Sequence, residues 1–127
     1  MLRRRVEVAY GAFQRDLGEL DLRLRAARAL ALDRNREAWA TVTAGQTPDV
    51  RLQAELRCAA VFATDVAVEV ATWAYRHAGR GAVYKPNFLE RAVRDLNTAT
   101  QHFIVSSAAY ETHGQGLLGM TGLNPLA

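Results

Sequence analysis

Side chains suited to acid–base chemistry gather in one stretch of the chain, residues 87–119. A cluster of charges, Arg91, Arg94 and Asp95, occupies the first half of this stretch. About two helical turns later comes His102. A histidine that apolar neighbours keep neutral is suited to general acid–base catalysis near pH 7. We therefore expect any chemistry of this chain to be centred here.

Each of these groups also has an ordinary structural explanation. Glu90 and Arg94 are spaced for an ion pair across one helical turn. Arg91 and Asp95 have the same spacing, and such pairs on a solvated face are worth roughly a few tenths of a kcal/mol. His102 precedes three apolar residues, which predicts a semi-apolar environment. Taken alone, a histidine in that environment is more often a satisfied core residue than a catalyst.

A second candidate is the short glycine-rich turn formed by Gly79, Arg80 and Gly81. Backbone amides in such a turn can approach a phosphate closely. Glycine is also the residue that commonly ends a helix. The turn by itself leaves both explanations open.

The titratable residues do not have the spacing of a metal site. His102 and His113 would lie ~16 Å apart along a continuous helix, so one ion cannot bind both. No cysteine and histidine residues have the spacing of a zinc site. Asp65 and Glu69 lie one turn apart, and we interpret them as part of a solvated helix face. We predict no metal.

Three long helical stretches are predicted to position these residues. They cover about 6–44, 48–78 and 88–113. The first is firm only from Leu17, because Gly11 and Gly18 each cost roughly 1 kcal/mol in a helix interior. The second has a regular apolar seam, typical of a bundle, formed by Leu52, Leu56, Ala59, Ala63, Val66, Val70, Trp73 and His77. A division of the third near Gln101 would turn three helices into four.

The connections between these stretches carry clear end signals. Gly45 is expected to end the first stretch, and Thr47 to cap the second, with Pro48 at its first position. Asn87 is expected to cap the third. The short connection between the first two stretches predicts that they are antiparallel neighbours.

Length and composition favour a single all-α domain. The chain has 127 residues, half of them apolar, and only three prolines. We predict one domain over 1–127, an up-down four-helix bundle built from the three long stretches, with the last one divided. The N-terminus (1–16) is expected to be frayed or extended, and residues 120–127 to form a loose tail. Cys58 is expected to be a small buried side chain, and as the single cysteine it forms no internal disulfide.

Charge and hydropathy argue against nucleic acid and membrane as partners. The net charge is +3, and the first fifty residues hold nine arginines against seven acidic residues, so local charge largely cancels. No stretch approaches the roughly 20 apolar residues of a membrane span. The basic N-terminus is not followed by the apolar segment of a signal peptide. We expect a cytoplasmic protein.

Several motifs follow one another in the chain: Gly79-Arg-Gly81, Pro86 to Asp95, Gln101 to Ser106, Tyr110 to Gly114 and Leu117 to Gly119. In this order and spacing they resemble the C-terminal helical domain of the acyl-CoA dehydrogenase superfamily. The match is best to its flavin-dependent monooxygenase branch, the two-component aromatic hydroxylases and dibenzothiophene-type oxygenases. The resemblance covers about residues 13–119 and implies a four-helix bundle that packs against an amino-terminal helical domain and a central β domain.

By this resemblance, Gly79, Arg80 and Gly81 match the turn that approaches the phosphates or adenosine of a flavin from a neighbouring subunit. Arg80 stands where the family often has a second glycine, so its side chain either binds phosphate or blocks the approach. Arg94 and Asp95 match the pair that orders the helical turn near the flavin. The implied cofactor is reduced FAD or FMN, which this chain alone is not expected to hold.

His102 matches the histidine that lies beside the isoalloxazine ring in the monooxygenase branch. The resemblance implies that it deprotonates a phenolic substrate or assists oxygen activation at the flavin. The dehydrogenase branch often needs a carboxylate just after the Arg-Asp motif, and Phe103 stands at the corresponding position here. Oxygenation is therefore favoured over acyl-CoA dehydrogenation, which stays the alternative.

The resemblance also implies partners. A bundle that normally packs against two further domains leaves apolar surface exposed, so we predict a homodimer or homotetramer. A separate polypeptide is one source of the missing flavin domains, and the isolated chain is predicted to be inactive. Two other classes stay open: a stand-alone oligomerisation module without catalysis, and a basic nucleic-acid-binding bundle.

Overall fold

The computed structural model describes residues 10–79, 87–102 and 104–126. These residues form four helices and no strand: α2 (Gly11–Thr43), α3 (Val50–His77), α5 (Phe88–Ala99) and α6 (Ala108–Leu117). The predicted all-α class is confirmed. The third long stretch is indeed divided, because the chain leaves the helical conformation between α5 and α6.

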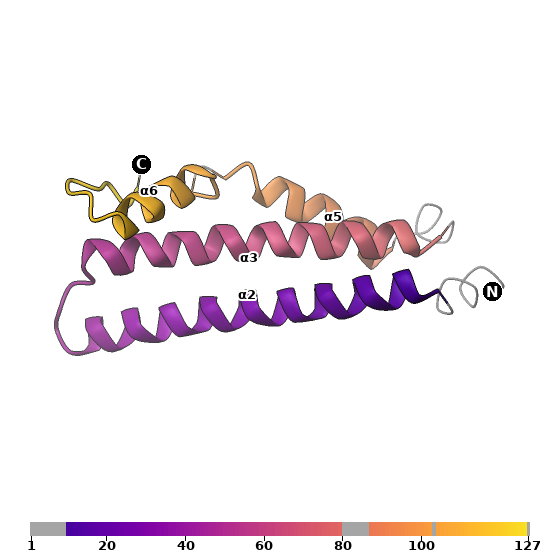
Figure 1. Cartoon of the computed structure of the whole chain (residues 1–127), viewed down its shortest axis with the longest axis horizontal. Helices are drawn as coiled ribbons and strands as arrows, with labels where there is room; N and C mark the ends of the chain where they lie inside the picture. Colours follow the sequence, from indigo (N-terminus) through magenta and orange to yellow (C-terminus); the bar gives the residue numbers. More distant parts are fainter. Residues whose placement is uncertain (1–9, 80–86, 103, 127) are drawn as a thin grey trace.

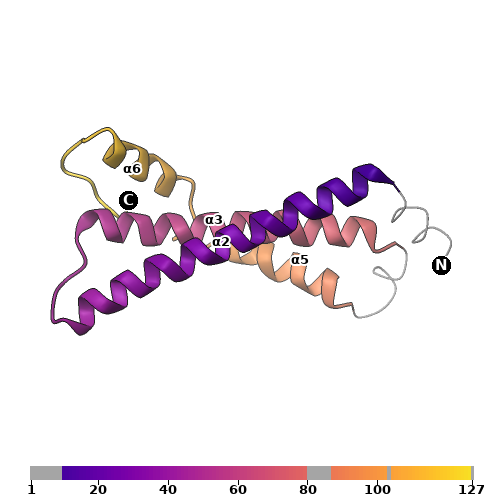
Figure 2. The same ribbon diagram turned by 60° about the horizontal axis from the view of Figure 1, so that its bottom comes forward.

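Helix α3 lies in the middle of the molecule and makes the main packing contacts with each of the other three helices (Figure 1). Helix α2 runs antiparallel to α3 and crosses it at an angle, as Figure 2 shows. Helices α5 and α6 follow one another back along another side of α3. The predicted up-down order is therefore confirmed, and α3 positions the elements that carry most of the candidate residues.

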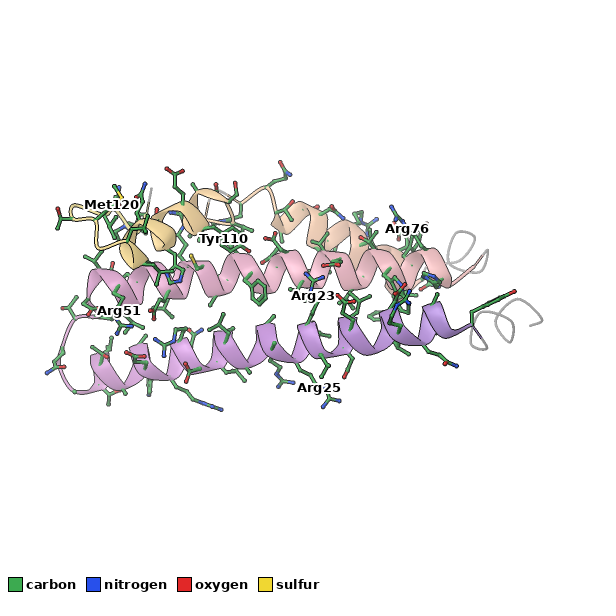
Figure 3. All side chains as sticks on the ribbon, viewed as in Figure 1. Arg23, Arg25, Arg51, Arg76, Tyr110 and Met120 are labelled. Atoms are coloured by element: carbon green, nitrogen blue, oxygen red, sulfur yellow. The ribbon has the colours of Figure 1, made fainter. Side chains whose placement is uncertain are left out.

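Ion pairs between α2 and α3 join the two helices along much of their length. Arg23 donates to Glu69 at 2.7 Å, and Arg34 donates to Glu55 at 2.6 Å. Figure 3 shows Arg23 pointing from α2 toward α3, whereas Arg25 points away from it. Glu69 keeps 46% of its side-chain surface exposed, so the prediction that it lies on a solvated face is confirmed, and its carboxylate also pairs with the neighbouring helix.

The helix ends agree with the predicted signals in part. Helix α2 already begins at Gly11, before the predicted firm start. Gly45 follows α2 with a φ of 76°, the left-handed conformation that favours glycine. The predicted cap at Thr47 is wrong: the Asp49 carboxylate accepts the Leu52 amide at 2.8 Å, and a charged acceptor at this position is a strong cap. The cap at Asn87 is confirmed.

Helix α6 continues to Leu117, past the predicted end near His113. Gly114 and Gly116 lie near the C-terminal end of α6, and Gly116 has a packing role. A Cβ at Gly116 would come within 3.3 Å of the Leu123 side chain, so glycine lets the C-terminal tail approach the helix. Gly119, with a φ of 74°, then supplies the left-handed turn that ends the helix.

The buried apolar core is small and belongs mainly to α3. Helix α2 has 33 residues but buries only two of them, Leu20 and Ala27. It leaves Leu22 68% and Trp39 75% exposed, so much of its apolar surface has no cover within the described residues. The buried apolar side chains are Leu20, Ala27, Leu52, Ala54, Cys58, Ala59, Val61, Val66, Ala71 and Ala109.

Helix α3 is long and apolar enough to cross a membrane by length and composition alone, with a mean hydropathy of 1.2 in its most apolar window. The expectation that no stretch approaches this limit is therefore wrong. The central position of α3 accounts for its composition, because three helices pack against it.

Candidate functional site

Helix α5 presents the predicted Arg-Asp motif to solvent. Arg94 and Asp95 keep 64% and 60% of their side-chain surface exposed. The predicted turn-to-turn pairs form, with 3.8 Å between Arg94 and Glu90 and 3.5 Å between Arg91 and Asp95. Pairs this exposed contribute little to stability, so they do not remove these charges from a ligand or a neighbouring domain.

A hollow of about 870 Å³ lies along α5 and contains this motif. Among the described residues, its lining comes from α5 alone: Asn87, Phe88, Glu90, Arg91, Ala92, Arg94 and Asp95. The Phe88 ring is 78% exposed. The hollow therefore combines two guanidinium groups, each paired with a carboxylate of the same helix, with an aromatic face that suits a planar ring. Guanidinium groups are suited to binding a phosphate or carboxylate.

His102 lies in the connector of residues 100–107, just beyond the end of α5. Its side chain is exposed, so this chain does not provide the predicted semi-apolar environment. The predicted burial is wrong because the helix breaks at this point, and the apolar residues after His102 are no longer placed around it by helical spacing. Val105 instead packs against the buried cluster of Cys58, Val61 and Ala109.

The imidazole of His102 is oriented by its own backbone. The Ile104 amide donates to Nδ1 of His102 at 3.3 Å. When the imidazole is neutral, an acceptor at Nδ1 places the proton on Nε2. In this neutral tautomer Nε2 is a hydrogen-bond donor rather than a proton acceptor.

The structure arranges the predicted residues along α5 rather than in one compact cluster. Gly79, with a φ of 74°, follows the end of α3 at the end of the molecule where α5 begins (Figure 1). His102 follows the other end of α5, and a helix of 12 residues spans ~18 Å. The motif of Arg94 and Asp95 lies between them. Arg80 and Gly81 lie outside the described residues.

Two contacts that the sequence did not reveal hold α6 against α3. The Tyr110 hydroxyl donates to the Asp65 carboxylate at 2.7 Å. Asp65 is exposed, so the prediction that it lies on a solvated face is confirmed, but the sequence did not reveal this partner. The Cys58 thiol donates to the Ala109 carbonyl at 2.9 Å, and its predicted burial is confirmed. Burial raises the pKa of Cys58. Burial and the neighbouring Asp65 carboxylate raise the pKa of Tyr110.

Replacing Tyr110 by phenylalanine is expected to lower the free energy of unfolding by about 1 kcal/mol at pH 7, because the hydrogen bond to Asp65 is lost. The raised pKa also links this bond to pH. Above the ordinary tyrosine pKa of 10.0 the unfolded chain loses the phenol proton while the folded chain keeps it, so stability falls with rising pH. Urea unfolding at pH 7 and about pH 11 should show a smaller alkaline loss in Tyr110→Phe than in the wild type. Tyr75→Phe is the matched control, and an equal alkaline loss in Tyr110→Phe and the wild type would refute the assignment.

A second concave region lies beside α6, away from the predicted residues. It consists of two hollows of about 560 and 450 Å³ that share Arg51, Glu55 and His113. Arg51 donates to Glu55 at 2.9 Å, so the shared charges compensate one another. Among the residues that the structure describes, no group of three or more metal-ligating side chains comes together.

Comparison with known proteins places this chain in a family. Residues 8–107 match the family model described as "Acyl-CoA dehydrogenase, C-terminal domain". The chain is 32% identical over 106 residues to the indole-3-acetate monooxygenase of Pseudomonas putida. The aligned region covers 84% of this chain and 27% of that protein. The chain thus spans about a quarter of the length of this relative. No solved structure matches. The family model covers most of the four-helix region, and the chain therefore belongs to the acyl-CoA dehydrogenase family, as a C-terminal helical domain.

Proposed function

We propose that this chain is the helical domain of a flavin-dependent monooxygenase with the acyl-CoA dehydrogenase fold, and that it contributes one wall of the flavin and substrate site. The observation that carries the proposal is the accessible row along α5, in which Arg94, Asp95 and His102 are all exposed. A wall whose polar groups face outward is suited to a site completed by other domains. The similarity to a monooxygenase supports oxygenation.

Each group in the row has a task that its chemistry suits. Arg94 would bind an anionic part of the cofactor, and Asp95 would accept from a ribose, ring or backbone donor. Phe88 would contact a planar ring. A bound reduced flavin, FAD or FMN, would supply the activation of oxygen. The exposure and charge of these residues are compatible with such a cofactor, and Gly79 would contact its phosphate end.

The orientation of His102 favours one of its two implied roles. A base that removes a phenolic proton at Nε2 needs that nitrogen unprotonated, which conflicts with the hydrogen bond from the Ile104 amide to Nδ1. A donor at Nε2 does not conflict with it. We therefore propose that His102 donates a hydrogen bond to the substrate or to the reacting oxygen, and that the substrate is aromatic, as the name of the similar indole-3-acetate monooxygenase suggests.

The remainder of the site would come from outside the four helices. We propose that a central β domain and an amino-terminal helical domain, in the same polypeptide or a separate one, complete it in a cytoplasmic homodimer or homotetramer. The exposed apolar side chains of α2, including Trp39, would be covered in that assembly.

The proposal can be tested by placing this chain in the Pseudomonas putida enzyme in exchange for its 106 matching residues. The chimera is expected to bind FAD or FMN, as measured by the absorbance of flavin retained after gel filtration. The isolated chain is expected to bind neither. A chimera that has native helicity and assembles as the parent does, but retains no flavin, would contradict the proposed site.

A stand-alone oligomerisation module is a second candidate, favoured by the exposed apolar surface of α2. Both candidates require self-association, so light scattering of the isolated chain at micromolar concentration tests this shared feature. Only the first requires flavin binding in the chimera. A chain that associates with itself while its chimera excludes flavin would favour the second.

A further inference from the structure

We infer that Arg57, a buried arginine on α3, is the positioning residue of His102 and acts through Ile104. The role of His102 in this inference rests on the proposed function, whereas the contacts of Arg57 are independent of it. Arg57 is only 8% exposed. Its Nε donates to the Ile104 carbonyl at 3.2 Å, and one of its terminal nitrogens donates to the Pro125 carbonyl at 3.3 Å.

The chain of contacts from Arg57 to the imidazole passes through one residue. Arg57 holds the carbonyl of Ile104, and the amide of Ile104 donates to Nδ1 of His102. The next amide, that of Val105, donates to the His102 carbonyl at 2.8 Å. Both the ring and the backbone of His102 are therefore bonded to a segment that Arg57 fixes to α3.

The inner side of the same segment is held by apolar contact. Val105 packs against Cys58, Val61 and Ala109, which lie in the buried cluster between α3 and α6. His102 nevertheless remains exposed. Val105 and Ile104 thus hold the connector against α3, while the imidazole of His102 stays exposed. An exposed imidazole is accessible to the domains proposed to complete the site.

An arginine is a costly choice for this position unless its donors are used. Burying a guanidinium carries a large desolvation cost, which hydrogen bonds must offset. Methionine would fill similar space without that cost. What methionine cannot do is donate from one planar group to two segments far apart in sequence, the connector at Ile104 and the tail at Pro125. We therefore infer that Arg57 stands at this position because it holds the connector and the tail together.

The inference is tested first in the isolated chain, which requires no flavin. In Arg57→Met, amide hydrogen exchange at Ile104 and Val105 is expected to accelerate on the order of tenfold, because both amides lose a fixed acceptor. The ring signals of His102 in NMR spectra should move toward those of an unstructured histidine, while the signals of His77 stay in place. Arg57→Lys keeps the charge but not the planar fork, so it should recover part of both effects. Arg76→Met, on an exposed part of α3, is the matched control.

The outcomes separate a positioning role from a general structural one. Unchanged His102 signals in a folded Arg57→Met chain would overturn the inference. So would a uniform acceleration of exchange across α2 and α3, because Arg57 would then support the whole fold. In the flavin-binding chimera, Arg57→Met should lower kcat severalfold with little change in KM. If the chimera loses no activity when His102 itself is removed, the proposed function fails while the contact between Arg57 and the connector stands.

Discussion

Under the proposed function, replacing His102 by alanine in the chimera with the Pseudomonas putida enzyme is expected to lower product formation by about a hundredfold, the low end of what one positioned hydrogen-bond donor contributes. The reason is that the exposed imidazole of His102 would supply a hydrogen-bond donor at Nε2, and alanine offers no donor in its place. The measurement is the rate of product formation by the chimera at saturating reduced flavin, oxygen and indole-3-acetate. Flavin retention should be unchanged, because Arg94 and Asp95 remain.

Two further variants sharpen this experiment. His113→Ala is the matched control, since His113 lies on α6 beside the second concave region, and its rate should stay within about twofold of the parent. His102→Gln tests the role itself, because a glutamine amide can donate a hydrogen bond but cannot act as a base. Partial recovery by glutamine supports the donor role. Equal losses in His102→Ala and His113→Ala would refute the assignment of His102.

The helical framework could be predicted from the sequence because it depends on local patterns. Apolar spacing along α3 identified Leu52, Ala59 and Val66, which are all buried in the structure. Asn87 has the residue type and position of an N-cap, and its side chain accepts the Leu89 amide at 2.8 Å. The division between α5 and α6 could be anticipated only as an open question, since no proline or glycine lies between residues 99 and 108.

The environment of His102 could not be predicted in the same way. Its burial was inferred from its sequence neighbours, an inference that holds only if the helix continues through them. Once the helix ends, the environment depends on contacts across the chain, such as that between Arg57 and Ile104, 47 residues apart. The signal for this contact was Arg57, an arginine beside the apolar run of α3. Its acceptor, the Ile104 carbonyl, could not be identified from neighbouring residues. The likeness to a family, rather than spacing, identified His102 as a functional candidate.

Replacing Val66 by alanine is expected to lower the free energy of unfolding by about 2 kcal/mol, through the lost burial of two methyl groups and the cavity left behind. Val66 is 1% exposed, and it is one of the two largest side chains that are fully buried. It lies on α3, against which α2, α5 and α6 all pack, so surrounding side chains have little freedom to fill the space. Urea unfolding followed by circular dichroism measures the change as a lower midpoint at an unchanged slope.

Val42→Ala is the matched control, because the same two methyl groups are removed from a side chain that is 55% exposed. Its effect should stay within about 0.5 kcal/mol, as expected for a surface substitution. The contrast tests the claim that α3, rather than the long helix α2, organises this domain. If the two variants lost equal stability, the core would have to extend over the outer face of α2, and the position of α5 and its connector could no longer be attributed to α3.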